Sequence, residues 1–395
     1  MRKIQTILIV VTAILFAGGC QQSSIKNKNW DSVSAKMKLT QAKEQFRSGE
    51  FEEARKNVQV CLMNDPQNTE ANLLYGQIFL AMDQFDKAVE HINIALNNNP
   101  TLAEGWYFLG IAYQTRRDNS KAEMYFRNAL DIEPQNIEFI LAVTDAMTAE
   151  NRYTEAIALI DEKGGLVGHD SRLTERKADL FRRLGEYQKA IEFYSNAMEL
   201  DKSDLTIREQ LGYCYMVTKQ FEKAADIFAA LSELSNEPRQ KNYFNKMRGI
   251  ACLRAGRFTQ AVDAFNKIAE DNRDDADMWI KLGQAYLGLK LTDDALTCAN
   301  RAIRISPESV EAMALNGSAY FMKNDYESAK SWFSKITVIE EKNSFAWLMK
   351  AKCCEKLGLI VDAREAFKTA SLISSGKLPQ KTEAEQKSDK IASNL

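Results

Sequence analysis

The feature that most constrains this chain is an alanine that returns at a nearly fixed interval. Successive alanines are 34 residues apart, with one interval of 37 between Ala224 and Ala261. A period of this length indicates stacked structural repeats, in which each unit packs mainly against its neighbours. Such a chain builds an extended surface and no single enclosed pocket, which favours binding over catalysis. The ten positions are Ala54, Ala88, Ala122, Ala156, Ala190, Ala224, Ala261, Ala295, Ala329 and Ala363.

The residues around each alanine identify the kind of repeat. In the third unit, aromatic and small residues and a closing proline stand at fixed distances from Ala122. This spacing resembles the tetratricopeptide repeat, a unit of two helices joined by a turn. The resemblance covers residues 35–373 and implies an all-α, right-handed α-α superhelical solenoid of about ten helix-turn-helix units. The pattern residues of this unit are Trp106, Leu109, Gly110, Tyr113, Ala122, Phe126, Ala129 and Pro134.

Two further sets of residues predict how the helices of each unit pack. Small residues stand where the two helices approach closely: Gly76, Gly110, Gly212, Gly283 and Gly317. A large residue four positions after the alanine is expected to fill the space between them: Phe126, Tyr194, Phe228, Phe265, Phe333 and Phe367.

Composition and motifs exclude several classes of function. The formal net charge is −2, whereas a nucleic-acid-binding protein needs a basic surface. The only two histidines, His91 and His169, lie two repeats apart, so we expect no histidine-rich metal site. No nucleotide-binding or hydrolase motif is present. We therefore expect a protein that is not an enzyme and holds neither a metal nor a cofactor.

The amino-terminal residues 1–19 resemble a bacterial lipoprotein signal. A basic start, Arg2-Lys3, is followed by an apolar stretch and by Ala17-Gly18-Gly19-Cys20. The resemblance implies cleavage before Cys20 and lipid on its thiol and its new amino group. The alternative is an uncleaved signal anchor, although Ile4 to Gly19 is short for a membrane span, which needs about 20 residues.

The lipid would hold the protein in the bacterial cell envelope. Gln21 follows Cys20, where an aspartate retains lipoproteins of familiar systems at the inner membrane, so we expect the outer membrane, facing the periplasm. Residues 20–34 are the lipidated cysteine and a polar tether. Repeats one to four occupy residues 35–170, repeats five to ten residues 171–373, and a polar tail residues 374–395.

The fourth repeat departs most from the pattern. Its second helix is expected to end at Lys163-Gly164-Gly165, where other units carry alanine. This is either decay of one repeat or a hinge between residues 35–170 and 171–373. An insertion at residues 235–242, which contains Pro238, marks a second possible junction.

Six cysteines remain besides Cys20, and no CxxC pair occurs among them. Cys61 and Cys252 occupy core positions of the repeat, where a thiol behaves as a small hydrophobe. We expect structural thiols, with a disulfide from Cys298 to Cys353 or Cys354 as the alternative.

In tetratricopeptide repeats the second, fifth, ninth, twelfth and thirteenth positions of the first helix line the concave face. Read onto this chain, many of these positions are apolar or aromatic, which favours a partner segment in the groove. The alternative is that neighbouring helices bury them. The candidate groove residues are Leu73, Tyr107, Ile111, Leu141, Tyr213, Met216, Tyr243, Ile280, Phe321 and Phe345.

The fifth repeat places Arg172, Arg182 and Arg183 at groove positions. They could contact carboxylates of an acidic partner. The alternative is that they pair with nearby acids such as Glu175 and Asp179.

We expect a non-enzymatic, membrane-tethered scaffold that binds a protein or peptide in its concave groove. It would assemble an envelope complex of the pilus or secretion, barrel-assembly or cell-wall type. The alternative is a glycan-binding accessory, or an envelope enzyme, of polysaccharide synthesis or export, in which groove tyrosines stack on sugar.

Overall fold

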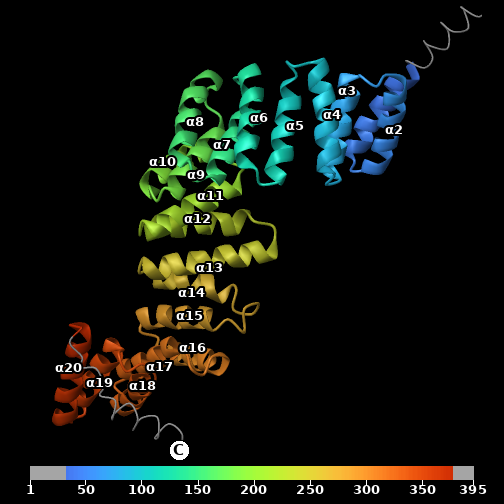
Figure 1. Ribbon diagram of the computed structural model, residues 1–395. Coiled ribbons are helices and arrows are strands. Elements are labelled where there is room, and N and C mark those ends of the chain that lie inside the picture. Colours follow the sequence, from blue (N-terminus) through green and yellow to red (C-terminus); the bar gives the residue numbers. More distant parts are fainter. Residues whose placement is uncertain (1–32, 377–395) are drawn as a thin grey trace, which may run out of the picture. The chain divides into compact units, whose positions relative to one another are not determined.

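The computed structural model describes residues 33–376, so the predicted signal segment, Cys20 and most of the predicted tail lie outside the described residues. Over that range the regular structure is helical, without strands. Its contacts fall into two compact units that divide between Lys202 and Ser203. Within each unit, helices that follow one another along the chain lie side by side (Figure 1). The predicted all-α class built from helix pairs is confirmed.

The first unit contains the first five helix pairs. The first helix of its first pair covers residues 33–47. The other first helices are α3 (Thr69–Ala81), α5 (Ala103–Thr115), α7 (Ile137–Ala149) and α9 (Ser171–Arg183). The second helices are α2 (Phe51–Asn64), α4 (Phe85–Asn98), α6 (Asn119–Ile132), α8 (Tyr153–Val167) and α10 (Tyr187–Leu200).

The second unit continues the same alternation through five more pairs. Its first helices are α11 (Leu205–Val217), α13 (Pro238–Arg254), α15 (Ala276–Gly288), α17 (Val310–Met322) and α19 (Ser344–Lys356). Its second helices are α12 (Phe221–Leu234), α14 (Phe258–Asn266), α16 (Thr292–Ile305), α18 (Tyr326–Ile339) and α20 (Ile360–Ser374). Between residues 33 and 376 no helix has both the length and the apolar character to cross a membrane.

The periodic alanine lies where the two helices of a pair are closest. It is always the fourth residue of the second helix, and all ten alanines are buried. The large residue four positions later fills the neighbouring space: Phe126, Tyr194, Phe228, Phe265 and Phe333 are completely or almost completely buried. A methyl group at Gly110 would lie 2.3 Å from the ring of Phe126. Only glycine therefore lets this aromatic ring lie directly on the backbone of the first helix.

A left-handed residue closes every first helix. The turn between the two helices of each pair holds one residue with φ between 55° and 81°. The amide of the residue that follows donates to a carbonyl five residues back, as Asp118 does to Tyr113 at 3.0 Å. Four of these residues are glycines and six are not: Gly49, Asp83, Arg117, Asn151, Gly185, Lys219, Gly256, Lys290, Asn324 and Gly358.

The second helix of the fourth repeat does not end at the predicted residues. Helix α8 continues through Gly164 and Gly165 to Val167, and Gly168, with φ 87°, ends it. Two helical glycines cost about 1 kcal/mol each relative to alanine, which the rest of the helix tolerates. The boundary between the two units lies one repeat after the predicted division at residue 170. The proposal of a hinge at that division stays a prediction.

The longer interval before Ala261 is absorbed by the first helix of the seventh repeat. Helix α13 has 17 residues, against 13 in α11 and α15, and begins with Pro238 in its first turn. Proline suits this position because the first amides of a helix have no partner within the helix. The inserted residues therefore extend a helix and do not form a long loop.

The six cysteines within the described residues are all free and buried. The alternative of a disulfide from Cys298 to its late neighbours is not observed. Burial raises the pKa of the Cys298 thiol to about 12 and that of Cys353 to about 11. Because the thiolate is the reactive form, these sulfurs are chemically quiet near neutral pH.

The close approach at Gly110 predicts opposite effects for two glycine-to-alanine substitutions. Gly110→Ala forces the buried Phe126 ring to move and should lower the free energy of unfolding by about 1–3 kcal/mol. Gly164→Ala, whose added methyl group meets nothing within 4 Å, should raise it by about 0.5–1 kcal/mol. Guanidinium unfolding followed by circular dichroism measures both, and shifts of the same sign would contradict the packing described.

The buried thiols predict a simple titration with Ellman's reagent at pH 8. In the folded protein, Cys61, Cys214, Cys252, Cys298, Cys353 and Cys354 should react only as the chain unfolds. In guanidinium without reductant all six should react promptly, together with Cys20 where it carries no lipid. A yield two thiols lower would reveal a disulfide and contradict the free-thiol structure.

Candidate functional site

The second unit exposes large apolar side chains on its first helices. Tyr213, Tyr243 and Phe345 are 46%, 45% and 49% exposed, although side chains of this kind are usually more deeply buried. All three stand at positions predicted to line the groove. First helices of the second unit also expose Val217 of α11, Met322 of α17 and Leu348 of α19. We call these six residues the exposed first-helix face.

Helices α11 and α13 bring two of these tyrosines together. The pKa of Tyr243 is raised by burial of part of its ring, by the nearby Glu209 carboxylate and by Tyr213. The Tyr243 ring also lies 5.5 Å from that of Phe244, which is completely buried. A rigid, half-exposed aromatic pair of this kind loses little conformational entropy when a partner binds.

A second apolar group lies on helices α17 and α19. Phe345 contacts the buried Phe333 edge to face, with ring centroids 6.0 Å apart. Phe321 lies 5.3 Å from the ring of Tyr326 and is half-buried. Met322 and Leu348 expose the remaining apolar surface of these helices.

Charged pairs lie between these two groups. The Lys246 Nζ of α13 is 2.6 Å from Asp275, just before α15, and Lys281 pairs with Asp277 within α15. The lysine side chains keep about a quarter to a third of their surface exposed. This face therefore alternates apolar and charged stretches, and charged stretches of this kind fix register more than affinity.

Two candidate groove residues are buried and are not available to a partner. Leu73 of α3 is 6% exposed and Ile280 of α15 is 8% exposed. Ile280 belongs to the hydrophobic core of the second unit. For these two residues the alternative interpretation, that the side chain is buried within the stack, is confirmed.

The remaining candidates are half-buried. Tyr107 packs against the rings of Phe126 and Phe139, with centroids 5.6 and 5.2 Å away. Ile111 and Leu141 pack on the same core, and Met216 on that of the second unit. In the first unit the apolar groove positions thus serve mainly to join adjacent repeats, which was the alternative interpretation.

Two of the three candidate arginines already have acidic partners within the chain. Arg172 pairs with Glu138 of the preceding repeat and approaches Asp170. Arg182 binds Asp179 at 2.9 Å. Arg183 is exposed at the end of α9, and its positive charge, like that of Arg176, acts on the Asp145 carboxylate. Contacts to an acidic partner are untested, but for Arg172 and Arg182 such a partner must displace an existing carboxylate.

Arg182 belongs to a network that reaches the core. Tyr194, the large residue of the fifth repeat, is completely buried and donates its hydroxyl to Asp179 at 2.6 Å. Burial, together with this hydrogen bond to a carboxylate, raises the pKa of Tyr194. Arg182 in turn donates to both groups. Its role in the structure is therefore to neutralise a carboxylate that holds the buried tyrosine.

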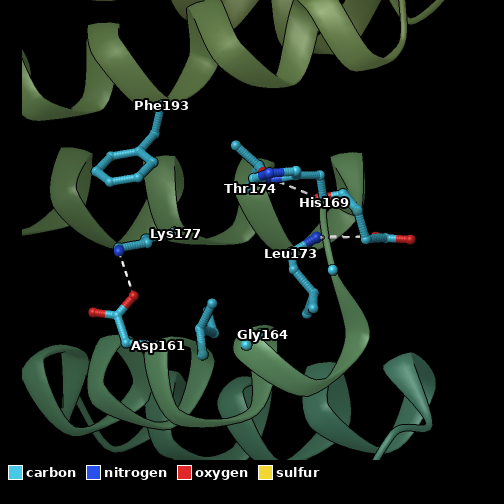
Figure 2. Close-up of a pocket in the computed structure, with 11 residues that line it drawn as sticks. Asp161, Gly164, His169, Leu173, Thr174, Lys177 and Phe193 are labelled. Carbon is cyan, nitrogen blue, oxygen red and sulfur yellow. Dashed lines mark hydrogen bonds and ion pairs between the residues drawn. The ribbon is translucent and has the colours of Figure 1, made fainter.

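A cavity of about 480 Å³ lies among α8, the turn after it, α9 and α10. Figure 2 shows Lys177 between Asp161 and Phe193, with Gly164 and Leu173 beside the open space. Lys177 forms an ion pair with Asp161, and its ammonium is 4.4 Å from the centre of the Phe193 ring. The lining residues are Ile160, Asp161, Gly164, Gly165, Gly168, His169, Asp170, Leu173, Thr174, Lys177 and Phe193.

The cavity was not predicted from the sequence. Gly164 and Gly165 were expected to end the helix, because glycine commonly follows a helix. A different signal was present: Lys177 occupies the leucine position of the third-unit pattern, represented there by Leu109. A charged residue at a core position of a repeat indicates that the local packing has changed.

The fold and these surfaces define a class of protein: a repeat scaffold of antiparallel helix pairs with side chains displayed on its first helices. Family models described as "Tetratricopeptide repeat" match residues 45–110, 103–136, 181–242 and 246–309. A model for "Anaphase-promoting complex, cyclosome, subunit 3" matches residues 288–370. The chain belongs to the tetratricopeptide-repeat family.

Similar proteins occur in organisms as different as a yeast and a mammal. "Superkiller protein 3" of Schizosaccharomyces pombe is 24% identical over 79% of this chain and 23% of its own length. "BBSome complex member BBS4" of Bos taurus is 28% identical over 39% of this chain and 29% of its own length. The chain thus spans less than a third of either relative. The solved structure of YrrB, "a TPR protein with an unusual peptide-binding site", covers 49% of this chain and 95% of its own, at 23% identity and a TM-score of 0.40.

Proposed function

We propose that the protein is a membrane-tethered scaffold that binds a segment of a partner protein along the exposed first-helix face of its second unit. The observation that carries this proposal is the exposure of the aromatic residues Tyr213, Tyr243 and Phe345 on first helices of the second unit, together with Val217, Met322 and Leu348. Exposed apolar surface rimmed by polar groups is typical of protein interaction sites. Tyrosine and other aromatic residues are also the ones that most often carry binding energy.

The proposed mechanism has two parts. Apolar side chains of the partner dock on the Tyr213–Tyr243 group and on the α17–α19 group, which gives most of the affinity. The ion-paired lysines between them, Lys246 and Lys281, discriminate against partners whose charges are misplaced. No covalent chemistry is involved.

The proposed location is the bacterial cell envelope, with lipid on Cys20 anchoring the chain. This rests on the resemblance of residues 1–20 to a lipoprotein signal. Each methylene of an acyl chain contributes about 0.8 kcal/mol when buried, and two or more chains hold a protein firmly. The partner would then be a component of an envelope assembly.

Photo-crosslinking in living cells tests the proposed face. A photoreactive residue at Tyr213, Tyr243 or Phe345 should capture one recurring protein. The same residue at Val338 of α18, which is 79% exposed, or at Glu222 of α12 should not capture it. The double substitution Tyr213→Ala/Tyr243→Ala should reduce capture from Phe345 at least tenfold, because it removes two aromatic anchors.

Equal capture at all five positions, or none, would overturn the proposed face. The competing glycan-binding function predicts a different result. Stacking of sugar on Tyr213 and Tyr243 would raise the melting temperature with glycan fragments and leave it unchanged with the captured protein.

Replacement of Cys20 tests the anchor. In cells fed an alkyne analogue of palmitate, the parent chain should be labelled and should begin at Cys20. Cys20→Ser should lose the label and keep residues 1–19, because neither lipid transfer nor cleavage can occur. A Cys20→Ser protein that is processed and membrane-bound like the parent would contradict lipidation, and an unlabelled parent that keeps residues 1–19 would identify a signal anchor.

A further inference from the structure

At the interface between the second and third repeats, side chains fill the space that corresponds to the cavity beside Lys177. Trp106 stacks on Tyr125, with ring centroids 6.0 Å apart and planes 17° apart. Leu96 packs so closely that a methyl group on Gly105 would lie 2.7 Å from it. These side chains belong to one hydrophobic cluster, which also contains Leu80, Val89 and Phe108. We call six of its nine residues the filled cluster: Ile92, Leu96, Leu102, Trp106, Leu109 and Tyr125.

The cavity beside Lys177 lies at the same repeat positions as the filled cluster, two repeats later along the chain. Adding 68, which is two repeats of 34, to the number of each of these six residues gives a residue that lines the cavity. The counterparts of Leu80, Val89 and Phe108, which are Thr148, Ile157 and Arg176, do not line it. Two counterparts keep the type of side chain: Ile160 replaces Ile92, and the aromatic Phe193 replaces Tyr125. The other four are Gly164, Asp170, Thr174 and Lys177.

The cavity is therefore the space left by side chains that this interface lacks. Gly164 replaces Leu96, and a methyl group built on Gly164 meets nothing within 4 Å. Thr174 replaces Trp106 and turns its hydroxyl back to the Asp170 carbonyl at 2.8 Å. An isobutyl group and an indole are thus absent from one place at once. Their aromatic partner is retained as the ring of Phe193.

The remaining groups have the chemistry of an aromatic site. Ile160 and Leu173 are 5% and 3% exposed and give the cavity apolar walls. The Lys177 ammonium, whose side chain is only 17% exposed, lies over the Phe193 ring. A cation at this place complements the electron-rich face of an indole better than it complements an aliphatic group.

We propose that this cavity binds a tryptophan side chain supplied by a partner polypeptide. The incoming indole takes the place that Trp106 occupies in the filled cluster. Phe181 already stacks on Phe193, with ring centroids 5.3 Å apart, and the Lys177 ammonium lies over the same ring. The indole therefore stacks on Phe193 by displacing the Lys177 ammonium from it. The site lies wholly within the first unit and uses none of the groove positions. It is thus a second binding site, independent of the exposed first-helix face.

Binding of N-acetyl-L-tryptophanamide to the purified full chain tests the proposal. Saturation-transfer NMR should show the indole protons in contact with the protein, with a Kd on the order of 1 mM, as suits so small a ligand. N-acetyl-L-leucinamide should bind at least fivefold more weakly, because it has no ring to stack on Phe193. Absence of tryptophanamide binding, or equal binding of both probes, would overturn the assignment.

Two variants locate the site. Gly164→Leu restores the residue of the filled cluster and should weaken tryptophanamide binding at least tenfold while the melting temperature is kept or raised. Thr174→Trp should do the same by supplying the indole from the chain itself. Glu162→Leu is the matched control, because it adds a leucine to α8 outside the cavity, and it should bind the probe like the parent. Unchanged binding in both filling variants would place the probe elsewhere and refute the proposal.

Discussion

The structure depends on one contact that recurs in five of the ten helix pairs: a large side chain of the second helix packs against a glycine of the first. Phe126 on Gly110 is the clearest case, with no room for a single added methyl group. This contact fixes the distance between the helices, and the buried alanine four residues earlier allows it. The faces that remain for neighbouring repeats and for partners are those that this packing leaves free.

Residue spacing was sufficient to predict the fold class and the helix pairs, because alanine, glycine and the large fourth residue are each required by that contact. The left-handed turns were not predicted. Arg117, Lys219 and Lys290 have positive φ, a conformation that glycine usually indicates in a sequence. Their residue types therefore do not predict it. At these turns the hydrogen bonds that end the first helix outweigh the preference of these residues for negative φ. The structure shows these hydrogen bonds, whereas the sequence does not.

Sequence position also did not predict which candidate groove residues are exposed. Position within the repeat placed Leu73 and Tyr213 alike on the groove, yet one is buried and the other nearly half exposed. Exposure depends on the size of the side chains on neighbouring helices, which a repeat pattern does not specify. The cavity beside Lys177 was accessible to sequence reasoning only through comparison of one interface with another. Departures from a repeat are informative when several fall at one interface, since isolated ones are readily tolerated.

The short second helix of the seventh repeat affects how the second unit responds to a pulling force. Helix α14 has nine residues, whereas α12 and α16 each have 14, and a series of turns over residues 267–274 replaces its last stretch. In a stack where each repeat contacts only its neighbours, tension passes through every joint in series. The joint whose second helix is shortest has the fewest helical hydrogen bonds to break and yields first. Under tension, the second unit would therefore lengthen between α14 and α15 while its other repeats stay folded.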